Sequence, residues 1–136
     1  MKPILLVLFF LSAYQRADAQ TETKPDYTYK LLVKFESICF GVPDASPLEK
    51  AIQSFKKSNK INTIAATKIA PMGREGEYHI GFTLNELTRN QQNKFIKKIK
   101  STAAKMKDKG QATCELDVIV ANADQASSVS RTKITY

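Results

Sequence analysis

The stretch Tyr29-Lys30-Leu31-Leu32-Val33-Lys34-Phe35-Glu36-Ser37-Ile38-Cys39-Phe40 decides how the rest of this chain is interpreted. Apolar side chains recur in it at alternate positions, namely Tyr29, Leu31, Val33, Phe35 and Cys39. A period of two residues is typical of a strand that buries one of its faces. The loop Gly41-Val42-Pro43-Asp44 follows and leads toward a helix. The stretch therefore predicts the first strand of a small domain in which helices pack on a sheet.

The residues before this strand have the pattern of an export signal. Residues 1–19 combine the charged Lys2, an apolar run from Ile4 to Ala13 and the small-x-small motif Ala17-Asp18-Ala19. The apolar run is shorter than the roughly 20 residues that a membrane-spanning helix needs. We therefore expect a signal peptide over 1–19, cleavage near Ala19, a secreted or periplasmic location, and a disordered polar leader over 20–27.

Composition limits the kinds of function. The chain carries 21 basic and 13 acidic residues, a formal net charge of +8, so anionic partners are favoured. Its 2 cysteines and 1 histidine make a four-ligand zinc site within one chain improbable. Gly73-Arg74-Glu75-Gly76 lacks the spacing of a phosphate-binding loop. We expect no metal and no cofactor.

Two helices are predicted, each with a start signal and one apolar stripe. Ser46-Pro47-Leu48-Glu49 and Thr88-Arg89-Asn90-Gln91 both have the capping-box pattern. The apolar stripe of the first helix consists of Leu48, Ala51, Ile52 and Phe55, and that of the second consists of Phe95, Ile96, Ile99, Ala103 and Met106. The opposite sides carry the lysines that we take as a candidate face for anionic ligands: Lys50, Lys57, Lys94, Lys97, Lys98, Lys100, Lys105 and Lys107.

Three further strands are predicted. Residues 61–70 are rich in β-branched side chains, and 78–84 alternate clearly; the turn residues 71–76 between them indicate a β-hairpin. Residues 114–120 form the last alternating segment. The chain from 122 to 136 is expected to be a polar tail, in which 132–136 form either a short edge strand or, the interpretation that we favour, a frayed end.

This order of elements predicts an α+β, two-layer sandwich over residues 28–121, with a four-stranded antiparallel sheet and two helices on one face. The pattern resembles the ferredoxin-like fold, also called split βαβ. The resemblance implies that the first and third strands are central and that the fourth lies beside the first. Because this fold hosts many unrelated functions, the resemblance identifies no family and no activity.

The implied strand arrangement also predicts a disulfide between Cys39 and Cys114. The first and fourth strands would run antiparallel, so that the end of one lies opposite the start of the other, with both cysteines on the inner face. An exported chain with an even number of cysteines commonly oxidises them. The alternative is two buried free thiols.

Families of the ferredoxin-like fold provide specific tests of function. Heavy-metal chaperones carry a Cys-x-x-Cys motif after the first strand, whereas Cys39 here has no second cysteine nearby. Acylphosphatases use a glycine-rich first loop with an arginine, which residues 37–46 lack. RNA-recognition domains stack bases on aromatic residues of the open sheet face. Here that face is expected to present mixed charges instead: Lys34, Glu36, His79, Gly81, Thr83, Glu115 and Asp117.

The leading functional interpretation is therefore a small secreted, non-enzymatic binding module. Its partner would be an anionic polymer, a membrane surface or another protein, without specific nucleic-acid recognition. One alternative is a domain similar to the subtilisin propeptides, which would inhibit a protease by placing the tail 122–136 in its cleft. Another is an enzyme that uses His79 as a base beside Glu36, Glu115 or Asp117 on the open sheet face.

Overall fold

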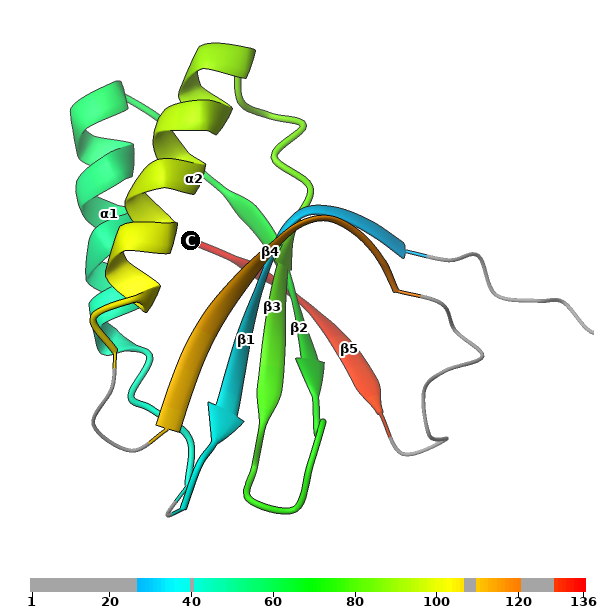
Figure 1. Cartoon of the computed structure of the whole chain (residues 1–136). Helices are drawn as coiled ribbons and strands as arrows, with labels where there is room; N and C mark the ends of the chain where they lie inside the picture. The colour runs from blue at the N-terminus through cyan, green and yellow to red at the C-terminus, as the bar shows by residue number, and fades with distance from the viewer. Residues whose placement is uncertain (1–26, 40, 107–109, 121–128) are drawn as a thin grey trace, which may run out of the picture.

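The computed structural model describes residues 27–39, 41–106, 110–120 and 129–136 (Figure 1). The chain forms an α+β domain in which two helices cover one face of an antiparallel sheet, an arrangement compatible with a ferredoxin-like fold. The elements in chain order are β1 (Tyr27–Ser37), α1 (Ser46–Asn59), β2 (Ala65–Ala70), β3 (Tyr78–Phe82), α2 (Arg89–Ala103), β4 (Gly110–Val120) and β5 (Ser130–Thr135).

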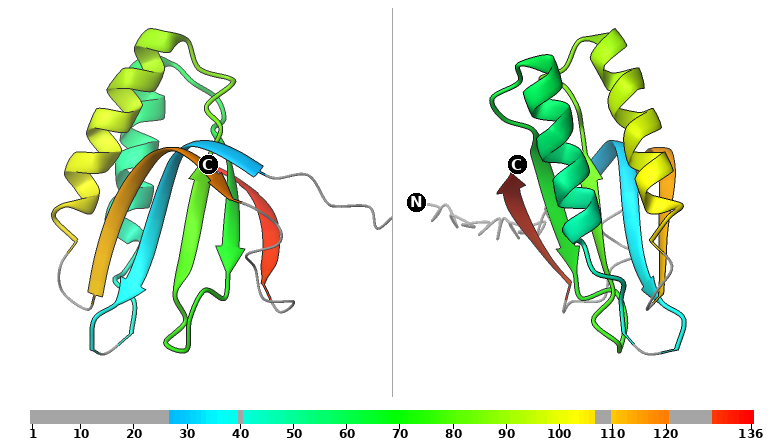
Figure 2. Two further views of the ribbon diagram at one scale, coloured as in Figure 1. Left: turned by 45° about the vertical axis from the view of Figure 1, so that its right-hand side comes forward. Right: turned by 90° about the vertical axis from the view of Figure 1, so that its left-hand side faces the viewer.

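The sheet has five strands in the order β4-β1-β3-β2-β5, and every neighbouring pair is antiparallel. The predicted placement of β1 and β3 in the centre, with β4 beside β1, is confirmed. The predicted number of four strands is wrong, because β5 pairs with β2 from Ala65↔Thr135 to Ala70↔Ser130. The last part of the predicted polar tail is therefore an edge strand (Figure 2).

Backbone and ring contacts hold this last strand in place. Just beyond β5, Tyr136 exchanges two backbone hydrogen bonds of 3.0 Å with Ile64, and its ring centroid lies 6.1 Å from that of Phe82. Of the two interpretations of residues 132–136, the edge strand is confirmed and the favoured frayed end is wrong. The sequence pattern could not decide between them because only Ile134 and Tyr136 of this segment pack against the core, which is too few residues to show a period.

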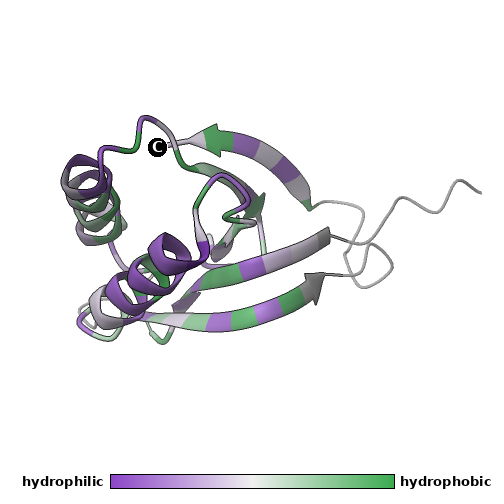
Figure 3. Ribbon diagram, turned by 90° about the horizontal axis from the view of Figure 1, so that it is seen from above, coloured by the Kyte–Doolittle hydropathy of each residue, from purple (hydrophilic) through white to green (hydrophobic). Residues whose placement is uncertain are grey.

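The main core lies between the helices and the sheet, as the apolar stripes predicted. Leu48, Ile52, Phe95 and Ile99 are fully buried against the inner side chains of β1 and β3, and Figure 3 shows the hydrophobic sides of both helices turned toward the sheet. The ring of Phe95 meets those of Phe55 and Phe82 edge to face, at centroid distances of 5.1 and 5.4 Å. Phe95 thus joins both helices to the sheet.

The structure has a second, smaller core, and Tyr29 belongs to it, so the predicted facing of Tyr29 is wrong. Tyr29 was expected beside Leu31, but it packs with Leu32 and Ile69, apart from the cluster that holds Leu31. The β1–β4 ladder pairs the residues on either side of Lys30 and leaves Lys30 and Asp117 themselves unpaired, and Asp117 has a positive φ of 50°. Figure 1 shows both strands bending in this region. The bend interrupts the alternation and turns the Tyr29 ring over Gly81, where a Cβ would lie only 2.4 Å from the ring.

The two helix starts differ from each other. At α2 the predicted capping box is confirmed: Thr88 Oγ1 accepts from the Gln91 amide at 3.4 Å, and the Gln91 side chain accepts from the Thr88 amide at 3.0 Å. At α1 the predicted capping box is wrong, since Ala45 is the N-cap and offers no side-chain hydrogen bond. The Asp44 carboxylate instead accepts from both the amide and the hydroxyl of Ser46, at 3.0 and 2.9 Å.

The predicted disulfide is also wrong, because Cys39 and Cys114 are both free thiols. Cys114 lies opposite Val33 in the ladder, whereas Cys39 lies beyond Ser37, the end of β1, which pairs with Gly110. The four residue-to-residue steps from Val33 to Ser37 span about 13 Å of strand, beyond the roughly 7 Å between Cα atoms that a disulfide allows. The prediction therefore placed β4 correctly beside β1, but it placed Cys39 and Cys114 at matching positions along the two strands, where they do not lie.

Several predictions fall on residues outside the described ranges. These are the signal peptide over 1–19, all of the leader except Tyr27, Lys107, and residues 122–128 of the tail. Tyr27 itself is the first residue of β1. Of the described helices, neither has the length and apolar character needed to cross a membrane.

Candidate functional site: the basic helical face

The outer side of the helical layer carries many basic residues. The α2 sequence Arg89–Ala103 contains one arginine and four lysines and no acidic residue. Six of the predicted lysines are exposed, namely Lys50, Lys57, Lys94, Lys97, Lys100 and Lys105, and Lys98 is half-buried. The structure thus places the described lysines of the predicted set on the solvent side of the helical layer.

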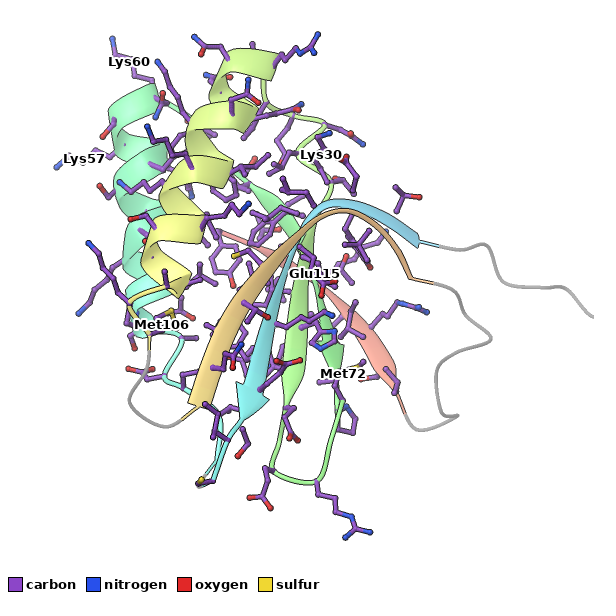
Figure 4. All side chains as sticks on the ribbon, in the orientation of Figure 1. Lys30, Lys57, Lys60, Met72, Met106 and Glu115 are labelled. Carbon is purple, nitrogen blue, oxygen red and sulfur yellow. The ribbon has the colours of Figure 1, made fainter. Side chains whose placement is uncertain are left out.

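A hydrogen bond between the helices shows which of their residues lie at the same level. Lys98 Nζ on α2 donates to Ser54 Oγ on α1 at 2.9 Å. Because the helices run antiparallel (Figure 1), one turn beyond this contact brings Lys57 on α1 to the same end as Lys94 on α2. Figure 4 shows Lys57 and Lys60 at this end of α1, extending away from the sheet.

Two basic residues at this end were missed by the sequence reasoning. Lys60 lies just after α1 in the left-handed conformation, with φ of 54°, and Arg89 is the first residue of α2; both are exposed. The prediction considered only positions opposite an apolar stripe, and residues at the helix ends fall outside such a count. The signal that could have found them is a basic residue next to an expected helix end. We define the basic helical face as Lys50, Lys57, Lys60, Arg89, Lys94, Lys97, Lys98, Lys100 and Lys105.

The acidic side chains of the described residues do not neutralise this face. The two ion pairs among those residues, Lys30–Asp117 and Lys34–Glu115, both join β1 to β4 and involve no residue of either helix. The nearest helical acid in sequence is Glu49, beside Lys50 in the first turn of α1. Positive charge is therefore concentrated away from that turn, over α2 and the last turn of α1.

The side chains considered for catalysis lie on the strands of the sheet, and two of them, Glu115 and Asp117, form ion pairs with lysines. His79 on β3 pairs across the sheet with Lys34, whose ammonium group binds the Glu115 carboxylate, while Asp117 binds Lys30. Glu36 lies opposite Gln111 on β4. Within the described ranges, no three side chains of the His, Cys, Asp and Glu types are grouped so as to hold a metal ion.

The environment of His79 leads to a pH prediction. Burial lowers the pKa of His79 below 6.5, the Lys34 charge lowers it further, and Glu115 partly opposes both. A lowered folded-state pKa means that the unfolded chain takes up the proton more readily. The stability that this group contributes is therefore present above about pH 6.5 and is lost as the pH falls through the folded-state pKa.

An NMR titration measures the pKa of His79 directly, because it is the single histidine of the sequence. We expect the Lys34→Met variant to raise the pKa of His79, because it removes the cation and releases the Glu115 carboxylate. A parent pKa at or above 6.5, or the same pKa in the variant, would contradict this description of the open sheet face.

Comparison with protein-family models, with curated proteins and with solved structures finds no match. Any functional conclusion therefore rests on the chemistry of the surfaces described above.

Proposed function

We propose that this chain is a small secreted, non-enzymatic binding module of ferredoxin-like fold that uses the basic helical face to hold an anionic polymer. The observation that carries the proposal is the exposed row of cations on α2 and the last turn of α1, joined by the Lys98–Ser54 hydrogen bond and lacking ion-pair partners among the described residues. Secretion rests on the sequence of residues 1–19.

The chemistry of the face suggests how such a ligand is held. Lysine ammonium groups are flexible point charges and do not provide the bidentate recognition of an arginine fork. Binding should therefore depend on the charge density of the polymer and tolerate differences in its detailed structure. The exposed large apolar side chains among the described residues are Ile38, Met72 and Leu116, and none lies on a helix. A hydrated polyanion, such as an acidic glycan, therefore suits the face better than a lipid bilayer that requires apolar insertion.

The two alternative functions receive less support. The described end of the tail, which a protease inhibitor would place in the cleft of its target, is a strand of the protein's own sheet. His79 pairs with a lysine, and the carboxylates Glu115 and Asp117 are engaged by Lys34 and Lys30.

A heparin titration with charge-matched variants tests the proposal. In Lys94→Gln/Lys97→Gln, two exposed cations of the face are lost; in Arg74→Gln/Lys133→Gln, two exposed cations of the hairpin turn and β5 are lost. At about 1 kcal/mol per lysine near an anionic surface, we expect roughly a 30-fold weaker affinity for the first variant at about 50 mM salt. The second variant should bind within about threefold of the parent, because its charges lie outside the basic helical face and salt screens their attraction to the polymer.

Salt provides an independent measurement. Raising the salt from about 50 to about 300 mM should weaken parent binding strongly, since exposed charges are screened. Equal losses in the two charge-matched variants would show that only net charge matters. Absence of heparin binding at low salt would contradict the proposal, and tighter binding to vesicles of anionic lipid than to heparin would replace the polymer with a membrane surface.

A further inference from the structure

The two edges of the sheet differ in how they are protected against pairing with another strand. Edge strands are commonly protected by short length, charged side chains or proline. The edge strand β5 has six residues and includes Arg131 and Lys133. The opposite edge, β4, has eleven residues and contains no lysine, arginine or proline. Its acidic side chains, Glu115 and Asp117, form ion pairs with lysines of β1, which offset their negative charge.

The positive φ of Asp117 bends β4 and leaves a regular run from Gly110 to Leu116. Leu116 in this run is 43% exposed, and Ile38 beyond the end of β1 is 65% exposed. An added strand along this run would cover exposed apolar surface and would satisfy the outward backbone groups of β4.

A cavity of about 550 Å³ opens beside this run, where the end of α2 meets the start of β4. Its lining is mainly apolar and includes Ala103, Ala104, Met106 and Ala112. Figure 4 shows Met106 at the lower end of α2, next to β4. A side chain projecting from an added strand near Ala112 on the helix side would enter this cavity.

Lys100 places a positive charge on the helix side of β4, near the cavity. It lies one helical turn before Ala104 and is exposed. Its charge also opposes the rise in the pKa of the Cys114 thiol that burial causes. Positions opposite Ala112 and Cys114 on an added strand are two residues apart and so point to the same side of the sheet. The first would meet the cavity and the second would meet the ammonium group of Lys100.

We propose that the β4 edge binds an extended peptide segment of an acidic partner protein, which adds a sixth strand to the sheet. The segment would carry an apolar side chain for the cavity and, two residues away, a carboxylate for Lys100. A second copy of this chain suits the edge less well, because each copy has a net charge of +8 and edge-to-edge pairing would bring two lysine-rich α2 helices to the same side of a joined sheet. This proposal shares Lys100 with the basic helical face but does not rest on the binding of a polymer there.

Fluorescence anisotropy with a designed probe tests the proposal. The probe is a fluorescein-labelled eight-residue peptide in which threonine alternates with valine, except for one central leucine and one glutamate two positions before it, the order that antiparallel pairing with β4 requires. Two further versions carry N-methyl groups on alternate residues, so that each version blocks one edge of the peptide strand. We expect the full chain to bind the unmodified probe and one methylated version, and to lose about tenfold or more affinity for the other, because one edge of the probe must pair with β4.

Two variants separate the cavity from the charge. Ala104→Phe should fill the cavity and weaken binding of the leucine probe by about tenfold, whereas Asn93→Phe, three turns earlier on the same side of α2, should not weaken it. Lys100→Gln should weaken the glutamate probe and leave a glutamine probe unchanged. No binding of the probe, equal binding of both methylated versions, or equal effects of Ala104→Phe and Asn93→Phe would overturn the proposal. A dimer in sedimentation that the probe dissociates would overturn the choice of occupant in favour of a second copy.

Discussion

Replacing Phe95 with alanine should lower the free energy of unfolding by about 3–5 kcal/mol, the range for removing a large aromatic side chain from a core. Phe95 is fully buried, and its ring contacts Phe55 on α1 and Phe82 on β3. The variant would therefore leave a cavity at the junction of both helices with the sheet. Small neighbours could not fill this space without moving a helix.

Urea denaturation of the parent and the variant measures the change, provided that both have the same dependence on urea concentration. Lys97→Ala is the matched control, since it lies two residues away on the exposed side of α2 and should change stability by no more than about 0.5 kcal/mol. Equal effects of the two substitutions would show that the buried face of α2 has been assigned incorrectly. A loss of cooperativity in Phe95→Ala alone would still agree with a central position for this ring.

The parts of the fold that the sequence predicted are those with many residues obeying one period. Each helix presents an apolar stripe of at least three buried residues, and a stripe can only be buried against another apolar surface. The strands β1, β3 and β4 alternate over at least five residues. Together with the order of elements, these patterns predicted the two layers, and the resemblance to the ferredoxin-like fold implied the central position of β1 and β3.

The parts that the sequence did not predict depend on contacts between distant segments. The facing of Tyr29 follows from the positive φ of Asp117, 88 positions later, where the ladder is interrupted. Nothing near Tyr29 in the sequence reports that bend. The wrong disulfide had a similar cause, because strand order does not fix the offset that places Cys114 opposite Val33.

The outward direction of the lysines in the candidate site was predicted from the sequence, but their contacts were not. Lysines opposite an apolar stripe must face solvent, so the outward direction of Lys94 and Lys97 followed from the helix period alone. The Lys98–Ser54 contact, in contrast, depends on how closely the two helices approach. The cavity beside β4 could not be seen from the sequence, because it requires the position of α2 relative to β4.

Deleting residues 130–136 should destabilise the domain by roughly 2–4 kcal/mol, the sum of lost apolar burial and lost strand pairing. The deletion removes β5, whose ladder to β2 runs over six residue pairs, and Tyr136, which packs beside Phe82 and bonds to the backbone of Ile64. It also exposes the edge of β2, so the truncated chain should associate at concentrations where the parent is monomeric. The urea midpoint and gel filtration measure these two effects.

The single substitution Lys133→Ala is the control, because this exposed side chain can be lost while the strand remains. An unchanged urea midpoint after the deletion would mean that the C-terminal residues are frayed in solution. Heparin affinity provides a further check at protein concentrations where the truncated chain is monomeric and folded. The deletion removes no residue of the basic helical face, so it should alter heparin binding no more than the loss of Arg131 and Lys133 does when these two are replaced by glutamine in the full chain. A much larger loss would locate the polymer on the β5 side of the sheet and away from the helices.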